Sequence, residues 1–270
     1  MTSTVTPVSQ LQAPATWRTV DLISDLHLQA SEASTFEVWQ RYMAHTPADA
    51  VLILGDLFGV WVGDDAVAQS PFLQSCAEVL KNTGQRLYLG LMHGNRDFLI
   101  GESFVQDCHA HFLEDPTLLR LGQASWLLSH GDALCLADVA YQQFRSQVRT
   151  PEWRRDFLKQ TLAERQAVAR GIRNQSEARK QVGTDTGSRE VYADADSALC
   201  LSSLAQAGAH TLIHGHTHQP ADHVLPKGAS GQGQARARWV LSDWDAGAQP
   251  PRAQVLRLFA NGQHERLDLV

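Results

Sequence analysis

The chain has 270 residues, 43% of them hydrophobic, which suits one large α/β domain, or such a domain with an inserted piece. Its formal net charge of −6 at pH 7 argues against general nucleic-acid binding, because affinity for the phosphate backbone comes from clustered Lys and Arg. Its apolar runs are all shorter than the roughly 18 residues that a membrane span needs, and its four scattered cysteines, without a C-x-x-C pair, indicate free thiols in a reducing compartment.

Residues 1–16 are polar and have neither a basic start nor an apolar segment, so they lack the pattern of a signal peptide. We expect a disordered extension over 1–16 and a single domain over 17–270. These features predict a soluble, cytoplasmic protein, and they leave open an association with a membrane surface.

The first half of the chain alternates short apolar runs with stretches of helical spacing. The last part returns to strand patterns. This mixed order is typical of a layered α/β domain in which functional groups stand in the loops after the strands. Strands are predicted over 18–24, 50–54, 86–91, 117–121, 125–129, 210–214, 237–242, 253–259 and 265–270, and helices over 32–46 and 70–83.

Residues 136–190 interrupt this alternation with a stretch that is rich in helical patterns. The stretch contains eleven Lys and Arg against seven Asp and Glu, a net charge of +4, while the rest of the chain carries −10. Pro151 suits the first turn of a new helix. Two interpretations stay open: a solvated helical hairpin whose charge keeps it soluble, or an inserted lid whose basic face attracts an anionic substrate or an anionic lipid surface. The sequence favours the lid.

Seven potential metal ligands follow apolar, strand-like runs in five short blocks. Carboxylates, imidazoles and an amide at strand ends are what a site for two metal ions requires. Four of the five blocks contain or adjoin a glycine, which permits a tight turn and a close approach of the backbone to a bound group. The seven residues are Asp25, His27, Asp56, Asn95, His130, His214 and His216.

The first two blocks also have structural interpretations. Asp25 and His27 are two residues apart, so an extended strand would point both side chains to one face, although a buried, hydrogen-bonded Asp–His pair has the same spacing. Asp56 follows the apolar run VLIL, where a buried charge needs a metal or polar partners. Its carboxylate could bridge two cations, or it could cap a following helix.

The remaining blocks favour ligation. In HGNRDFLIG, Asn95 offers a neutral oxygen to a hard cation and Arg96 offers a fork of donors to phosphate oxygens, although Asn and Gly are also common in turns. His130 in SHGD and the histidines of HGHTH add imidazoles. We expect His214 and His216 to face the metals and His218 to lie outside them, as an outer or surface residue.

This ordered set of D-x-H, G-D, G-N-x-D, H-G-D and G-H-x-H resembles the calcineurin-like metallophosphoesterases over roughly residues 18–220. Within that superfamily, SDLHL, GDLFGVWVGDD, HGNRDFLIG, SHGDALC, AYQQFR and LIHGHTHQP resemble the UDP-2,3-diacylglucosamine hydrolase family of lipid A biosynthesis. The resemblance implies a β-sandwich flanked by helices, a helical insert as lid, and two Mn²⁺ ions per subunit. It also implies a lipid substrate and peripheral association with the cytoplasmic face of the inner membrane.

The resemblance also implies roles for individual residues. One metal would be held by Asp25, His27, Asp56 and His216, and the other by Asp56, Asn95, His130 and His214, with Asp56 bridging. The catalytic residues would be Asp56 and Arg96. Substrate contacts would come from Asn95, Arg96, Asp138, Ser176, Lys180 and His214. The sequence departs from the family pattern at Ala137, where a second Asp usually stands, and at Lys180, where the family has Asn.

Arg96 stands where many superfamily members have the His of G-N-H-D, a residue that can protonate a leaving oxygen. In pyrophosphate cleavage the leaving group is already a stable phosphate, so charge neutralisation matters more than a general acid. We therefore expect hydrolysis of UDP-2,3-diacylglucosamine at its α-phosphorus, giving UMP and 2,3-diacylglucosamine 1-phosphate. The alternatives are a metallophosphoesterase for another nucleotide or phosphodiester, and a scaffold without catalytic activity.

Overall fold

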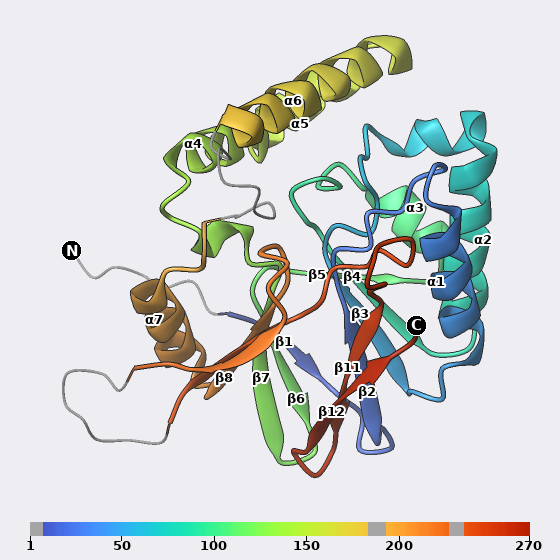
Figure 1. Cartoon of the computed structure of the whole chain (residues 1–270). Coiled ribbons are helices and arrows are strands. Elements are labelled where there is room, and N and C mark those ends of the chain that lie inside the picture. The colour runs from blue at the N-terminus through green and yellow to red at the C-terminus, as the bar shows by residue number, and fades with distance from the viewer. Residues whose placement is uncertain (1–7, 183–192, 227–234) are drawn as a thin grey trace.

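The computed structural model describes residues 8–182, 193–226 and 235–270, with side chains described for all of these except 173–182. Within these ranges two six-stranded sheets face each other (Figure 1). Their strand orders are β1-β6-β7-β8-β10-β9 and β12-β11-β2-β3-β4-β5. The strands are β1 Ser9–Gln12, β2 Thr19–Ile23, β3 Ala50–Leu54, β4 Tyr88–Met92, β5 His111–Leu113, β6 Thr117–Leu121, β7 Ala124–Ser129, β8 Thr211–His214, β9 Ala221–Val224, β10 Ala237–Val240, β11 Gln254–Phe259 and β12 His264–Asp268.

Each sheet contains a run of adjacent parallel strands. β2, β3, β4 and β5 run parallel in one sheet, and β7, β8 and β10 run parallel in the other. All five residues of β3, AVLIL, are buried, because a central parallel strand is covered on both faces and therefore reads as a continuous apolar run. The loops after these strands begin at the same end of each sheet, where side chains from distant parts of the sequence meet.

Three apolar clusters fill the layers, and successive strand residues alternate between them. Leu52 of β3 packs between the two sheets with Leu128 of β7 and Ile213 of β8. Val51, the neighbour of Leu52, packs on the outer face against helices. On the outside of the other sheet, Leu127 belongs to a third cluster. The molecule is thus layered as helices, sheet, sheet, helix, as Figure 1 shows.

The helices cover the outer faces and one end of the two sheets (Figure 1). α1 to α3 flank one sheet, and α7 covers the other. The segment between β7 and α7 holds α4, α5 and α6, which lie beyond the strand ends. Pro151 begins α5 as predicted, with the Thr150 side chain as N-cap. The bounds are α1 Ala33–His45, η1 Asp64–Gln69, α2 Pro71–Gly84, α3 Glu102–Asp107, η2 Asp132–Leu134, α4 Val139–Val148, α5 Pro151–Leu158, α6 Leu162–Val182 and α7 Ser197–Ala207.

The expectation of disorder over residues 1–16 is wrong where the structure describes that segment. Ser9–Gln12 form β1, an edge strand that pairs in parallel with β6 and brings Leu11 opposite Leu119. Leu11 and Ala13 pack on the apolar layer between the sheets. The segment has a polar composition because an edge strand buries few of its side chains. Its pairing uses backbone hydrogen bonds, which a composition pattern cannot reveal.

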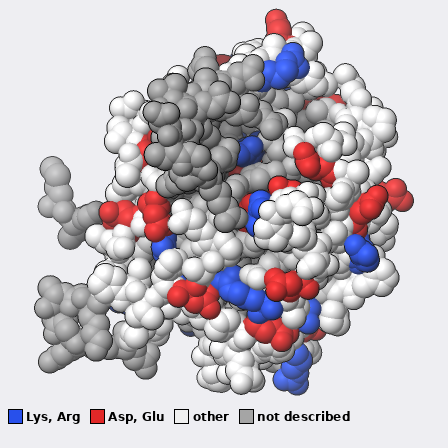
Figure 2. Space-filling model, viewed as in Figure 1, with Lys and Arg blue, Asp and Glu red and all other residues white. Residues whose placement is uncertain are grey.

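No helix among the described residues combines the length and apolar character needed to cross a membrane. On the face drawn in Figure 2, acidic and basic side chains of the described residues are intermixed. That face therefore carries no extended basic surface of the kind that follows a nucleic-acid backbone.

Candidate metal centre

Loops from both sheets bring the predicted ligands together at the carboxyl ends of the parallel strands. Asp25 and His27 follow β2, Asp56 follows β3, Asn95 follows β4 and His130 follows β7. Asp25 and His27 do not lie in an extended segment, because β2 ends at Ile23 and both residues have positive φ angles of 54° and 48°. Asp56 has φ 52°. Non-glycine residues in this conformation are strained, and such strain concentrates at functional sites.

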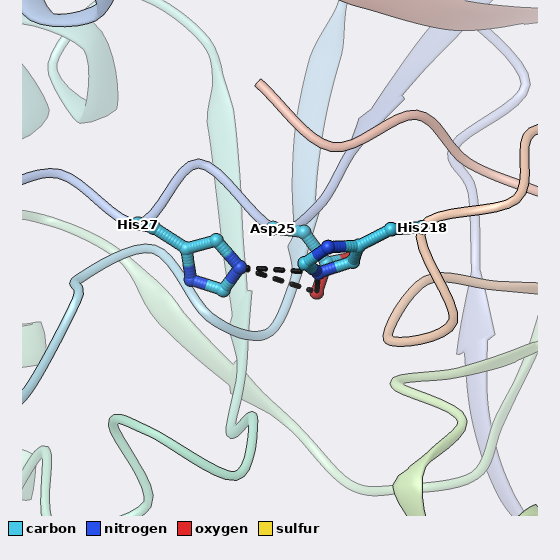
Figure 3. Close-up of side chains that lie close together, drawn as sticks. All are labelled: Asp25, His27 and His218. Carbon is cyan, nitrogen blue, oxygen red and sulfur yellow. Dashed lines mark hydrogen bonds and ion pairs between the residues drawn. The ribbon is translucent and has the colours of Figure 1, made fainter. Parts of the chain in front are cut away.

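The first group of ligand atoms surrounds Asp25. His27 Nε2 lies 4.0 Å from Asp25 Oδ1, and His218 Nε2 lies 3.3 Å from the same oxygen. The two imidazole Nε2 atoms are 3.2 Å apart, and both rings converge on the carboxylate in Figure 3. Asp25, His27 and His218 each offer one ligand atom within a sphere that suits a single cation.

The second group surrounds Asn95. Its Oδ1 lies 3.0 Å from His130 Nε2 and 2.8 Å from His216 Nδ1. Asp56 stands between the two groups, because its Oδ1 lies 3.8 Å from His130 Nε2 and its Oδ2 lies 3.8 Å from His27 Nδ1. This carboxylate faces both groups, as a ligand that bridges two metal ions would.

The structure groups His218 with Asp25 and His27, although we expected His218 to lie outside the ligand set, while the predicted ligand His214 stands at the end of β8. His214 is the last residue of β8 and is fully buried. Its Nδ1 contacts the Gly215 carbonyl at 2.8 Å, and the ring packs against Gly131, where an added Cβ would lie 2.7 Å from Nδ1. His216 and His218 follow the strand with positive φ angles of 64° and 53°, which turn their rings toward the groups around Asn95 and Asp25.

Hydrogen bonds behind the ligands fix which atoms face the centre. Asp25 Oδ2 accepts from Ser24 Oγ at 2.6 Å and from the His216 backbone N–H at 2.8 Å. His130 Nδ1 contacts the Leu54 carbonyl at 2.9 Å, which leaves Nε2 directed inward. Partners of this kind orient metal-binding imidazoles and carboxylates.

Asp97, the acid of the G-N-x-D block, ties two of these loops together. Its buried carboxylate accepts backbone N–H groups of Gly94 at 2.8 Å, Asp56 at 3.3 Å and Leu57 at 2.7 Å. It therefore holds the loop after β3 against the loop after β4. Sequence reasoning gave this residue no role, and its place in the G-N-x-D block is the only signal that could have found it.

Burial and mutual charge set the protonation of the site. Burial raises the pKa of Asp56 to about 7, against the influence of His130. Burial alone would lower the pKa of His130, but Asp56 and Asp25 outweigh it and raise that pKa to about 9. Burial lowers the pKa of His27 well below its usual value and that of His216 to about 3. Neutral imidazoles are the form that binds metals.

Two observations show that the residues fit a metal centre. Asp25 Oδ1 and His27 Nδ1 are buried and have no hydrogen-bond partner among the described residues, and such groups are costly without compensation. The ligand atoms also lie close together, with the Nε2 atoms of His27 and His218 3.2 Å apart. Divalent cations would satisfy the unpaired atoms and favour the ionised form of Asp56.

The structure places the predicted substrate-binding residues in different environments. Arg96 lies at the centre, with Nε 3.6 Å from Asp56 Oδ2 and its backbone N–H donating to Asp56 Oδ1 at 2.8 Å. Asp138 is exposed, and its carboxylate caps α4 by accepting from the Tyr141 N–H at 3.0 Å. Ser176 and Lys180 fall within α6, but their side chains lie outside the described residues.

Comparisons with known proteins match this chain to one family and to relatives that share one name. Residues 18–220 match the model of the calcineurin-like phosphoesterase family. A protein of Bordetella pertussis named UDP-2,3-diacylglucosamine hydrolase is 40% identical over 245 residues, which cover 89% of this chain and 92% of that protein. Proteins of the same name from Chromobacterium violaceum and Stutzerimonas stutzeri are 41% and 37% identical, covering 84% and 90% of this chain and 91% and 96% of theirs. The α/β class predicted from the sequence is confirmed.

Proposed function

This chain belongs to the calcineurin-like phosphoesterase family, and from that premise we propose that it hydrolyses the pyrophosphate bond of UDP-2,3-diacylglucosamine. The products are UMP and 2,3-diacylglucosamine 1-phosphate, released by attack at the α-phosphorus. The substrate follows the name of the relatives that match most of the chain. The reaction class follows the site, which gathers oxygen and nitrogen ligands for hard or intermediate divalent cations.

The observation that carries the proposal is Asp56, placed between two groups of ligands with Arg96 beside it. We assign one ion to Asp25, His27, Asp56 and His218, and the other to Asp56, Asn95, His130 and His216. Two Mn²⁺ ions suit this mixture of carboxylate, amide and imidazole ligands. When bound, the ions supply neutralisation of phosphate charge and a lowered pKa for coordinated water.

Arg96 supplies the remaining positive charge. Its backbone N–H is fixed on Asp56, while its guanidinium lies partly exposed at the centre. A guanidinium presents a fork of donors that matches two phosphate oxygens. Attack at the α-phosphorus makes the sugar 1-phosphate the leaving group, and this is already a stable anion, so stabilisation of negative charge on the phosphoryl oxygens is the main requirement. Arg96 meets that requirement without acting as a general acid.

The helical insert provides an apolar surface for the acyl chains and for the membrane. Leu158, Val168 and Ile172 are large apolar side chains that are 41%, 40% and 38% exposed. They lie on α5 and α6, within the segment that carries the excess of basic residues. Apolar side chains beside cations suit an anionic lipid surface. We infer peripheral association with the cytoplasmic face of the inner membrane.

The test of the activity is direct. Purified protein with Mn²⁺ and UDP-2,3-diacylglucosamine should release UMP, quantified by chromatography. Asp56→Asn, which removes the bridging charge and preserves the volume, should lower the rate by at least about 100-fold, in line with the loss of a main electrostatic contributor. Absence of UMP together with rapid hydrolysis of bis(p-nitrophenyl) phosphate would instead assign a phosphodiesterase of another substrate class.

The membrane proposal has its own test. Sedimentation with phosphatidylglycerol vesicles should carry the wild type into the pellet, less so at high salt because surface charge is screened. Val168→Asp with Ile172→Asp should reduce the bound fraction several-fold. Val224→Asp is the matched control, because Val224 is 79% exposed but stands on β9, outside the insert. Equal loss of binding in all variants would reject the insert as the contact surface.

A further inference from the structure

Asp132 is a buried carboxylate whose side-chain hydrogen bonds go to the insert. It follows His130 in the loop after β7 and is fully buried. Its Oδ2 accepts from Tyr141 Oη at 2.5 Å and from Arg145 Nε at 2.8 Å. Both donors belong to α4, where residues four apart share one face. A buried carboxylate requires such compensation, so Asp132 fastens α4 to the loop that carries His130.

Arg149 extends the same face of α4 to a second loop. One turn beyond Arg145, its Nη2 donates to the Gly94 carbonyl at 2.8 Å and lies 3.3 Å from Asp132 Oδ2. Its guanidinium carbon lies 5.0 Å from the centre of the Phe98 ring, within the range of a cation–π contact. A single guanidinium therefore joins the insert, the loop of residues 94–98 and the loop of His130.

The position of Gly94 affects the whole centre. Its Cα packs so closely on Asp56 that an added Cβ would overlap the carboxylate. The next residue, Asn95, holds its Oδ1 within 3.0 Å of His130 and His216, and Arg96 donates its backbone N–H to Asp56. A shift of the Gly94 carbonyl would therefore move a metal ligand and the phosphate-binding guanidinium together.

We propose that Arg149 is a positioning residue for the loop of residues 94–97. It holds the Gly94 carbonyl so that Asn95 and Arg96 stay aligned with Asp56, and it makes their alignment depend on docking of the insert. The inference deepens the proposed function and rests on it for its kinetic consequence. Its structural part, the anchoring of the loop, stands on the contacts of Arg149 alone.

The experiment compares Arg149→Met, Arg149→Lys and Arg120→Met with wild type at saturating Mn²⁺. Methionine keeps the apolar stem without donors, and lysine keeps one charge that can reach one acceptor but lacks the planar fork. Arg120 is exposed on β6 and contacts Gln10, so its variant controls for loss of one cation. Hydrogen exchange of the 94–98 amides is measured without substrate, and kcat and KM are measured for UMP release.

Arg149→Met should accelerate exchange of the 94–98 amides several-fold and lower kcat by about 10- to 100-fold, the effect of misplacing reacting groups by an ångström or less. KM should stay within about threefold, because a mispositioned transition-state contact lowers kcat and kcat/KM together. Arg149→Lys should be intermediate in both measurements, and Arg120→Met should match wild type. If Arg149→Met does not fold, the lysine variant decides between these outcomes.

Three results would overturn the inference. Exchange of the 94–98 amides at the wild-type rate would show that Arg149 does not anchor the loop. A raised KM with unchanged kcat would show that it merely attracts an anionic substrate. Equal losses in Arg120→Met would show a general charge effect. Wild-type protein that releases no UMP would refute the proposed substrate, but faster exchange in Arg149→Met would still support the anchoring role.

Discussion

The structure and the sequence pattern predict different metal ligands among the histidines of HGHTH. His218 Nε2 lies within 3.3 Å of Asp25 Oδ1 and His27 Nε2, whereas His214 is buried at the end of β8. We therefore expect His218→Ala to weaken metal binding and His214→Ala to leave it intact. The two substitutions remove the same side chain from positions four residues apart, so each is the control for the other.

The size of the effect follows from the affinity that one ligand contributes to the metal site. Removing an outer partner of a metal ligand already costs about 10- to 100-fold in affinity, so removal of the His218 ligand itself should cost at least about 100-fold. At free Mn²⁺ about a thousandfold above Kd, a bound ion stabilises the folded state by about 4.1 kcal/mol. A 100-fold weaker site retains about 1.4 kcal/mol, so His218→Ala should lose about 2.7 kcal/mol of the metal-dependent stabilisation.

The assay is urea unfolding of each protein with EDTA and with saturating Mn²⁺, together with metal content by mass spectrometry. The difference between the two unfolding free energies isolates the metal term from any effect on the apoprotein. His214→Ala should lower both free energies, because it opens a cavity in the core, and keep their difference at the wild-type value. A difference that vanishes in His214→Ala and persists in His218→Ala would refute the assignment of ligands made from the structure.

Other predictions concern the frame of the site. Arg257→Met should cost about 3 kcal/mol in urea unfolding, because Arg257 donates to the buried Asp21 at 2.7 and 2.8 Å and its loss leaves that carboxylate without a counter-charge, held only by the Tyr42 and Thr46 hydroxyls; metal content should not change. Gly55→Ala should abolish metal binding or folding, because Gly55 has φ 89° and an added Cβ would lie 2.5 Å from His130 Nδ1. Gly208→Ala, at φ 64° with nothing within 4 Å, should cost about 1 kcal/mol and spare the metals. Finally, EDTA should stop UMP release and Mn²⁺ should restore it; release by metal-free protein would reject metal dependence.

The regular elements were largely predictable from the sequence, because strands and helices leave periodic burial patterns. The strand predicted over 50–54 is β3, the strand over 117–121 is β6, and the helix over 70–83 corresponds to α2. Short or poorly buried elements were missed. β1 and β9 are edge strands with few buried residues, and their main contribution is backbone pairing, which has no side-chain signature.

The positions of the ligand blocks were also predictable, since each follows an apolar run and four of the five have glycine in or beside them. The directions of the side chains were not. Asp25 and His27 have positive φ, and the contact between Asp25 Oδ2 and the His216 N–H joins residues 191 apart in the sequence. The contacts of Arg149 with Gly94 and Asp132 join segments up to 55 residues apart, which local sequence patterns do not relate.

The sequence alone therefore determined the chemical type of the site, because ligand types and their order along the chain are local properties. It also indicated Arg96 as the phosphate-binding group. Tertiary structure decided which histidines of HGHTH lie beside the other candidate ligands, since their spacing of two is the same for either pair. β8 ends at the buried His214, and the turn that follows directs His216 toward Asn95 and His218 toward Asp25.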